Sequence, residues 1–430
     1  MNPAYWTDWL SDSQSVFAWR AGRAVTRADF AQLAANVAAL LPARQFHINR
    51  CSSRYLFTLG LVAAALRGAT CLLPGAAGAA AVAELQQRYP AANMLDDTVV
   101  TSLAAGPAAS SISRELCAPD HVIAIAFTSG STGEPRACAK TWRFLASSAN
   151  YCREQVGGGR VLNLVATVPP QHMFGLEASV CTALAAGWAM FDGPSFLPAE
   201  VIAALVSLPQ PRLLVTSPFH LRHLLASDIE LPPVDVVLSA TAPLSAELAR
   251  EAEQKFAGVV QEIYGCTEAG SLGTRRTAID LLYRPYPGLL FNRLNGGCTV
   301  TAPHLDDAVV LSDQLEFAAD GRFELLGRDS DMVKVAGRRA SLADITSKLQ
   351  SLPGVLDAVV FVPADGDNVR PAALVVAPGQ SDARLRAALA SLMDPVFIPR
   401  PLRLVRSLPR NTLGKLLRAE LLKILEQHRG

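Results

Sequence analysis

The chain has 430 residues, of which 50% are hydrophobic and 18% are charged. This length predicts two or three domains, and the apolar content excludes a mainly disordered chain, which would need low hydrophobicity and a high net charge. The 39 lysines and arginines nearly balance 38 acidic residues, so the net charge is +1. That balance argues against a dedicated nucleic-acid binder, because phosphate contacts need a strong positive field.

The eight cysteines are scattered singly and form no Cys-x-x-Cys pair. Such cysteines indicate small buried side chains in a reducing compartment rather than disulfides, and a zinc site would need paired ligands. The N-terminus carries no basic-then-apolar secretion signal, and the most apolar stretch, 56–83, is interrupted by Arg67 and Pro74. A membrane-spanning helix needs about 20 uninterrupted apolar residues. We therefore expect a soluble, cytoplasmic protein without stable membrane insertion.

Short apolar runs alternate with Ala- and Leu-rich helical patterns through most of the first 300 residues. The strand patterns lie at 70–74, 122–127, 161–168, 213–216 and 234–239. The helical patterns lie at 33–41, 56–66, 198–208, 219–226 and 245–256. This alternation predicts an α/β fold with largely parallel sheets that are covered by helices on both faces.

The arrangement of strand and helical patterns changes near residue 328. Strand patterns at 332–335, 355–362, 372–377 and 401–405 are interspersed with helical patterns at 341–352 and 383–393. We expect a large N-terminal domain over 1–328 and a small α+β domain over 329–430. Residues 400–430 hold eight lysines and arginines against two acidic residues, a local charge of +6. That segment is either a solvated helix face or a surface that attracts an acidic partner.

The sharpest local motif is FTSGSTGEPR at 127–136. An apolar run leads directly into a loop of Gly, Ser and Thr, with the cation Arg136 after Pro135. Free backbone N–H groups and hydroxyls at close approach are what a polyphosphate requires, although the loop does not match the Walker pattern GxxxxGK[ST]. The other interpretation is an ordinary Gly/Ser turn between a strand and a helix.

Further polar segments follow apolar runs later in the chain. In YGCTE (264–268), Thr267 could hold a phosphate oxygen and Glu268 could bind Mg²⁺, a hard cation that prefers oxygen. A capped turn is the alternative for this pentapeptide. Asp313 stands at a strand end and Arg328 ends the next predicted hairpin, where a carboxylate suits ribose hydroxyls and an arginine suits hydroxyls or phosphate. Lys415 lies behind a glycine in the loop LPRNTLGK (408–415), from which it could approach charge developing on phosphate and carboxylate oxygens.

Taken in order, these segments resemble the adenylate-forming enzymes, which include acyl- and aryl-CoA synthetases, peptide-synthetase adenylation domains and luciferases. The matching segments are FTSGSTGEPR (127–136), VPPQHMFG (168–175), SATAPL (239–244), YGCTE (264–268), LSD (311–313), GRDSDMVKVAGRR (327–339) and LPRNTLGK (408–415). Each motif is weak alone, but chance does not account for all of them in this order at plausible spacings. The resemblance extends from about residue 17 to the C-terminus.

The resemblance implies a two-step, ATP-dependent ligase with a large N-terminal domain and a small mobile C-terminal domain. In the first step a carboxylate attacks the α-phosphate of MgATP and gives acyl-AMP and pyrophosphate. In the second, after the small domain has rotated, the acyl group passes to the thiol of CoA or of a carrier protein's phosphopantetheine. The implied cofactors are therefore ATP, Mg²⁺ and a phosphopantetheine-bearing acceptor.

Individual roles follow from the matching positions. The implied phosphate loop consists of Thr128, Ser129, Gly130, Ser131, Thr132 and Gly133, followed by Arg136. The implied adenine wall consists of Ser239, Ala240, Thr241 and Tyr264, and the ribose contacts are Asp313 and Arg328. The implied catalytic residues are Thr267 on phosphate, Glu268 on magnesium, Lys415 as the adenylation lysine and His172 beside the carboxylate pocket. For His172 a satisfied core histidine is the alternative, and Tyr264 could serve packing only.

Several features depart from the family's pattern: Asp344-Ile345-Thr346 stands where Glu-Ile-Glu is usual, the chain is shorter than typical members, and two further positions bear on the chemistry. Arg136 stands where the family usually has lysine, which keeps the charge but changes its geometry. Ser330 stands at the hinge position, where the family has an acid or a lysine. These last two departures support an alternative in which the protein is a degenerate ligase acting as a nucleotide- or acyl-binding module or partner subunit. Because Glu268, Asp313 and Lys415 are all retained, we expect an active enzyme.

The expected substrate is an aryl or medium-chain carboxylic acid, and the acceptor is CoA or an acyl carrier protein. The basic segment 400–430 could steer an acidic carrier protein or contact the phosphates of CoA. Amino-acid activation is disfavoured. Peptide-synthetase adenylation domains usually anchor the substrate's ammonium with an Asp after the segment that contains His172, and here that stretch reads Gly175-Leu176-Glu177. A luciferase-like oxidase would share every motif. The sequence predicts no oligomeric state.

Overall fold

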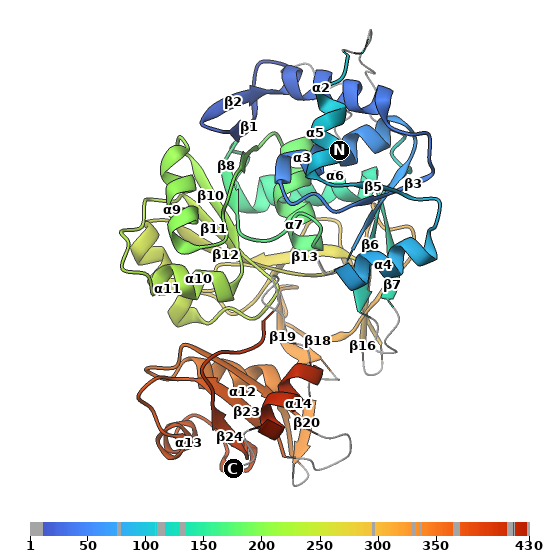
Figure 1. The fold of residues 1–430 in the computed structure, drawn as a ribbon. Helices are drawn as coiled ribbons and strands as arrows, with labels where there is room; N and C mark the ends of the chain where they lie inside the picture. The colour runs from blue at the N-terminus through green and yellow to red at the C-terminus, as the bar shows by residue number, and fades with distance from the viewer. Residues whose placement is uncertain are drawn as a thin grey trace.

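A computed structural model describes residues 12–427 apart from 75–78, 108, 110–116, 130–134, 295–296, 329–331, 336–337, 364–369, 411–415 and 417. Its N-terminal part contains a nine-stranded and a five-stranded sheet, and its C-terminal elements form a separate body below strands β18 and β19 (Figure 1). The predicted combination of a large α/β part and a small α+β part is confirmed. No helix among the described residues is long and apolar enough to cross a membrane.

The nine-stranded sheet has the order β14-β13-β12-β11-β10-β8-β9-β1-β2. Its central strands run parallel from β1 to β12, and β2, β13 and β14 join antiparallel. The strands are β1 (Val16–Arg20), β2 (Arg23–Thr26), β8 (Asn163–Ala166), β9 (Ala189–Asp192), β10 (Arg212–Thr216), β11 (Val236–Ser239), β12 (Val259–Cys266), β13 (Gly270–Arg275) and β14 (Arg284–Pro285).

Helices cover both faces of this sheet, as its continuous apolar strands predict. On β10, Leu213 and Val215 enter one hydrophobic cluster, and Leu214 between them enters another. The helices that pack on the Leu214 side are α9 (Pro198–Ser207), α10 (Pro218–Leu225) and α11 (Ala246–Phe256). The other face is covered by a run of α- and π-helical turns, namely α6 (Trp142–Tyr151), η1 (Cys152–Val156), α7 (Met173–Gly175), η2 (Leu176–Cys181) and α8 (Thr182–Ala185).

The five-stranded sheet has the order β5-β3-β4-β6-β7. Its strands are β3 (Phe46–Asn49), β4 (Thr70–Leu73), β5 (Asn93–Leu95), β6 (Val122–Ser129) and β7 (Pro135–Thr141). Its helices are α3 (Arg54–Leu66), α4 (Ala79–Arg88) and α5 (Asp97–Ala104), while α2 (Arg27–Leu40) packs on α3 and α5 and on strands β1 and β2 of the larger sheet. Helix α3 is almost entirely buried because it contacts β3, β4 and β6 of this sheet and β9 of the larger one. An all-round apolar helix is expected at such a central place.

Small antiparallel sheets connect the two parts of the chain, and the sequence patterns did not predict most of them. Their strands are β15 (Leu290–Leu294), β16 (Gly297–Thr301), β17 (Val309–Leu311), β18 (Asp313–Phe317) and β19 (Phe323–Arg328). Only the β18–β19 hairpin was expected, and its end at residue 328 is confirmed. Asp313 opens β18 rather than ending the preceding strand, since β17 stops at Leu311.

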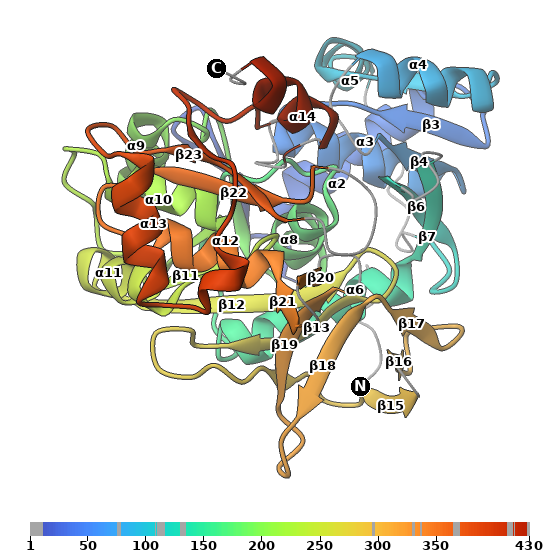
Figure 2. The same cartoon turned by 90° about the horizontal axis from the view of Figure 1, so that it is seen from below.

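The C-terminal part has hydrophobic clusters of its own. Figure 2 shows its strands and helices from below. Its strands are β20 (Met332–Val335), β21 (Arg338–Ser341), β22 (Asp357–Phe361), β23 (Ala372–Val376) and β24 (Leu402–Leu404). Its helices are α12 (Leu342–Gln350), α13 (Asp382–Ala390), η4 (Pro395–Phe397) and α14 (Arg418–Gln427). All eight cysteines are free thiols and six are buried, which agrees with their expected role as small apolar side chains.

Candidate active site

The predicted site residues of the nine-stranded sheet lie at one edge. Strands β8, β10, β11 and β12 are parallel, so their carboxyl ends meet there. The segment containing His172 follows β8, Ser239 ends β11, and Thr267 follows β12. In open α/β sheets this carboxyl edge is where ligands bind. The topology thus brings together the expected acid-pocket, adenine and phosphate positions.

The turn after β11 has two features typical of a ligand contact. The side chain of Ser239 is fully buried, and its Oγ has no hydrogen-bond partner among the described residues. Two residues later, the exposed Thr241 has a φ of 81°, which is unfavourable for a β-branched residue. Orphaned buried polar atoms and strained backbone both concentrate at functional sites. Ala240 between them is buried.

The expected adenine and ribose residues are directly linked. Tyr264 Oη donates a hydrogen bond to Asp313 Oδ2 over 3.0 Å, and both side chains are buried. Asp313 is also the backbone partner of Arg328 in the β18–β19 ladder. The bond holds the Tyr264 ring in a defined position beside Asp313. Asp313 and the main chain of Arg328 therefore lie side by side, next to Tyr264 of β12.

Thr267 and Glu268 form the turn between β12 and β13, and both are half-buried. A magnesium ion commonly takes one or two protein carboxylates and completes its shell with phosphate oxygens and water. The oxygen donors of this turn fit that description. No group of three or more His, Cys, Asp or Glu side chains that could hold a metal occurs within the described part of the chain.

The expected phosphate loop joins β6 to β7 as a hairpin. Thr128 pairs with Arg136 and Ser129 with Pro135, so the element after the loop is a strand, in contrast to the strand-to-helix turn considered as the alternative. Arg136 is exposed at the base of this hairpin. The remaining loop residues, Gly130, Ser131, Thr132 and Gly133, lie outside the described residues.

The loop of the expected adenylation lysine is held at both ends. Lys415 lies outside the described residues, as does Ser330, but Arg410 and Leu416 on either side of that loop form a β-bridge. The Arg410 guanidinium binds both oxygens of Asp357 at 2.6 and 2.7 Å. It also stacks over Phe219 of α10, with 5.2 Å between Cζ and the ring centroid. This loop therefore starts at a contact between the C-terminal part and the α/β part.

His172 is the N-cap residue of α7 and is half-buried at the start of the α7–η2 segment. Five residues later, Glu177 is buried among hydrogen-bond donors. Its carboxylate accepts bonds from Ser148 Oγ and from the Oγ and N of Ser271, the last two over 2.9 and 3.3 Å. Burial raises the pKa of Glu177, while these bonds and the nearby Lys140 oppose that rise.

Sequence reasoning missed Lys140, although its signal was a charged residue directly after the small, apolar run Ala137–Ala139 of β7 (PRACAKT). Lys140 is 1% exposed, and its Nζ donates to the backbone carbonyl of Glu268 over 2.9 Å. The ammonium also lies 3.9 Å from the ring centroid of Phe144. Burial lowers the pKa of Lys140, and the charge of Glu177 opposes that change. This bond joins the hairpin of the expected phosphate loop in one sheet to the Thr267–Glu268 turn of the other.

Gly270, which opens β13, allows this arrangement and provides a stability prediction. Its φ is 75°, and a Cβ there would lie 2.5 Å from Glu177 Oε1 and 2.8 Å from Phe144 Cζ. We expect Gly270→Ala to reduce the free energy of unfolding by about 2–4 kcal/mol, from backbone strain plus overpacking. Urea unfolding measures this, with Gly297→Ala as the control because its position has open space. Equal losses in both variants would contradict the prediction.

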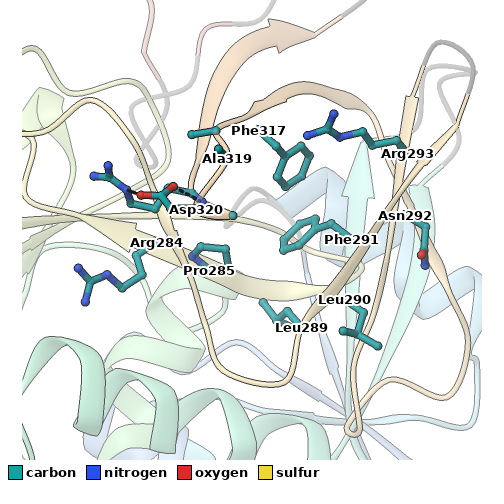
Figure 3. Close-up of a pocket in the computed structure, with 13 residues that line it drawn as sticks. Arg284, Pro285, Leu289, Leu290, Phe291, Asn292, Arg293, Phe317, Ala319 and Asp320 are labelled. Atoms are coloured by element: carbon teal, nitrogen blue, oxygen red, sulfur yellow. Dashed lines mark hydrogen bonds and ion pairs between the residues drawn. The ribbon is translucent and has the colours of Figure 1, made fainter.

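The structure also has a surface hollow of about 890 Å³ that is separate from these residues (Figure 3). It lies between β14, β15, β18 and the turn after β18. Phe291 and Phe317 form its apolar floor, and Arg293 stacks on Phe317 at 4.9 Å from the ring centroid. None of the site residues expected from the sequence lines it.

Comparison with known proteins agrees with this geometry. The family model described as AMP-binding enzyme matches residues 20–310. A 4-coumarate–CoA ligase of Halorhodospira halophila is 28% identical over 70% of this chain and 76% of its own length. A 3-hydroxybenzoate/4-hydroxybenzoate–CoA ligase of Thauera aromatica is 24% identical over 72% of this chain and 67% of its own.

Solved structures show the same fold. O-succinylbenzoate coenzyme A synthetase of Bacillus subtilis in complex with AMP has a TM-score of 0.81 at 19% identity, covering 97% of this chain and 98% of that one. ATP-bound MatB of Rhodopseudomonas palustris has a TM-score of 0.79 at 20% identity, covering 99% of both chains. The family match spans more than half of the chain and includes nearly all of the α/β part. The named CoA ligases and synthetases above are relatives of this chain, which therefore belongs to the AMP-binding enzyme family.

Proposed function

We propose that the protein adenylates a carboxylic acid with ATP and then transfers the acyl group to a phosphopantetheine thiol. The observation that carries this proposal is the convergence of His172, Ser239 and the Thr267–Glu268 turn at one sheet edge, beside the bonded pair Tyr264 and Asp313. Family membership supports acid adenylation and thioester formation as the general chemistry.

In the first step an oxygen of the acid's carboxylate forms a bond to the α-phosphorus of ATP. The bond from that phosphorus to the bridging oxygen breaks, and pyrophosphate leaves with its electron pair. Asp313 and Arg328 would orient the ribose, and Thr267 with the 128–133 loop would hold phosphate oxygens. Lys415 would balance charge that grows on the α-phosphate and carboxylate oxygens. Mg²⁺, when held by Glu268 and phosphate oxygens, would supply further charge neutralisation.

In the second step the thiol sulfur attacks the acyl carbon, and the carbon–oxygen bond to the phosphate breaks. AMP leaves and the thiol proton passes to solvent. We infer that 329–430 is a mobile domain. It carries Lys415 into the active site for the first step and out of the active site for the second. The contacts that such a rotation would break include Arg222 Nη2 to Gln350 Oε1 at 2.7 Å and the stacking of Arg410 on Phe219.

We propose an aryl or medium-chain acid as the substrate. Aryl acids are supported by the names of the relatives, which include ligases for 4-coumarate and hydroxybenzoates. Amino-acid activation is disfavoured because the Glu177 carboxylate is already bonded to Ser148 and Ser271 and lies near the charge of Lys140. A substrate ammonium would have to displace these partners.

The acceptor is CoA or an acyl carrier protein. Several of the relatives are named CoA ligases. Another relative, Phosphinothricin tripeptide synthetase PhsC of Streptomyces viridochromogenes, is named a peptide synthetase instead. It is 29% identical over 75% of this chain and 33% of its own length. The basic residues of 400–430 suit either acceptor, because both the phosphates of CoA and an acidic carrier surface are anionic.

ATP–pyrophosphate exchange tests the first step without any thiol. We expect Mg²⁺-dependent exchange with one class in a panel of aryl, short, medium and long-chain acids. The thiol acceptor is then identified by adding CoA or a carrier protein and measuring thioester formation by mass spectrometry. If ATP binds but no acid supports exchange, the alternative of a degenerate binding module is favoured, with Arg136 and Ser330 as the first positions to revert.

A further inference from the structure

Lys140 occupies an unusual place for a lysine. It lies on β7, the strand that follows the phosphate hairpin, yet it is 1% exposed and not solvated. An isolated buried ammonium is strongly unfavourable unless it is paired and hydrogen-bonded. Its retention in this core therefore requires both a counter-charge and a hydrogen-bond acceptor.

The structure supplies both from different motifs. The hydrogen-bond acceptor is the main-chain carbonyl of Glu268, at 2.9 Å from Nζ. The counter-charge is Glu177 on the α7–η2 segment, whose attraction favours the charged form of Lys140. The Glu177 carboxylate also accepts hydrogen bonds from Ser271, which lies on β13, three residues after Glu268. One buried polar cluster therefore contacts this segment at two points, the carbonyl of Glu268 in the turn and Ser271 at the start of β13.

A hydrogen bond to the main-chain carbonyl of Glu268 holds the residue in place and leaves its side chain available to bind a metal. Glu268 leaves its carboxylate half-buried and accessible while its carbonyl is held from the interior. Partners that orient a metal ligand from behind commonly affect metal affinity by about 10–100-fold. The cation–π contact of Lys140 with Phe144 restrains the ammonium further.

We propose that Lys140 is a positioning residue for the first half-reaction: through the carbonyl of Glu268 it orders the 266–271 turn that presents the expected magnesium carboxylate. Glu177 makes this placement possible by balancing its charge. The inference rests on the proposed function for its catalytic consequence, but the ordering of the turn can be measured independently of activity.

The test separates positioning from simple charge balance. Lys140→Met alone leaves Glu177 buried without its counter-charge, so we expect a lower melting temperature. The double variant Lys140→Met/Glu177→Gln removes both charges and should recover most of that loss. If positioning is the role, the double variant should still need about ten-fold more Mg²⁺ for half-maximal ATP–pyrophosphate exchange than the wild type. Amide hydrogen exchange of peptides covering 266–271 should also be faster.

Lys255→Met is the matched control, because Lys255 also donates to a main-chain carbonyl, that of Leu225 over 2.7 Å, but lies on α11. It should change neither the Mg²⁺ requirement nor the exchange of 266–271. Wild-type values of both in the stable double variant would overturn the positioning role. If the wild type catalyses no pyrophosphate exchange at all, the proposed function fails, and the amide exchange still decides whether Lys140 orders the turn.

Discussion

Lys415→Ala is expected to reduce ATP–pyrophosphate exchange by about 10²–10³-fold, the size of effect seen when one preorganised donor to developing charge is removed. The effect should fall on kcat, while the dissociation constant of ATP measured by calorimetry changes little. The reason is that, in the proposed mechanism, Lys415 contacts charge that is present mainly in the transition state. The adjoining bridge between Arg410 and Leu416 is main-chain pairing, which the alanine does not remove.

Lys423→Ala is the control for Lys415→Ala. Lys423 lies on α14 in the same C-terminal part, is largely exposed, and pairs with Glu420 one helical turn away. It should retain full exchange activity. Thioester formation from chemically prepared acyl-AMP should survive in Lys415→Ala, because that step does not require the adenylation lysine. Turnover of Lys415→Ala within ten-fold of the wild type would show that another group balances the charge.

Glu268→Gln should lower exchange by about 10²-fold at ordinary Mg²⁺ concentrations, because a neutral amide replaces the one carboxylate that the turn offers. Raising the Mg²⁺ concentration should restore part of the rate by mass action. No such recovery is expected for Lys415→Ala, so a Mg²⁺ titration distinguishes the two roles. The substitution keeps the size of the side chain and leaves the carbonyl that Lys140 binds.

Glu251→Gln controls for the loss of a carboxylate elsewhere. Glu251 lies on α11 and forms an exposed i,i+4 pair with Lys255, an interaction of small net energy. We expect unchanged exchange and an unchanged Mg²⁺ requirement in this variant. A Glu268→Gln enzyme with the Mg²⁺ requirement of the wild type would assign magnesium to other groups.

Local sequence patterns predicted many elements well because each has a strong periodic or apolar signal. The patterns at 213–216 and 332–335 correspond to β10 (Arg212–Thr216) and β20 (Met332–Val335). The strands between 284 and 311 were missed, since short antiparallel strands on a partly exposed sheet have weak alternation and depend on their neighbours. The strand after the phosphate loop was missed for the same reason: β7 is held by pairing with β6 rather than by its own composition.

The sequence by itself determined the family, the order of its motifs and the candidate residues, because Gly-rich loops, the YGCTE turn and the lysine loop are local chemical signatures. Only the tertiary structure decided which distant residues act together. The Tyr264–Asp313 bond and the link from Lys140 to the Glu268 carbonyl both join residues far apart in the chain. Strand order and burial create these contacts, and neither is encoded in any one segment.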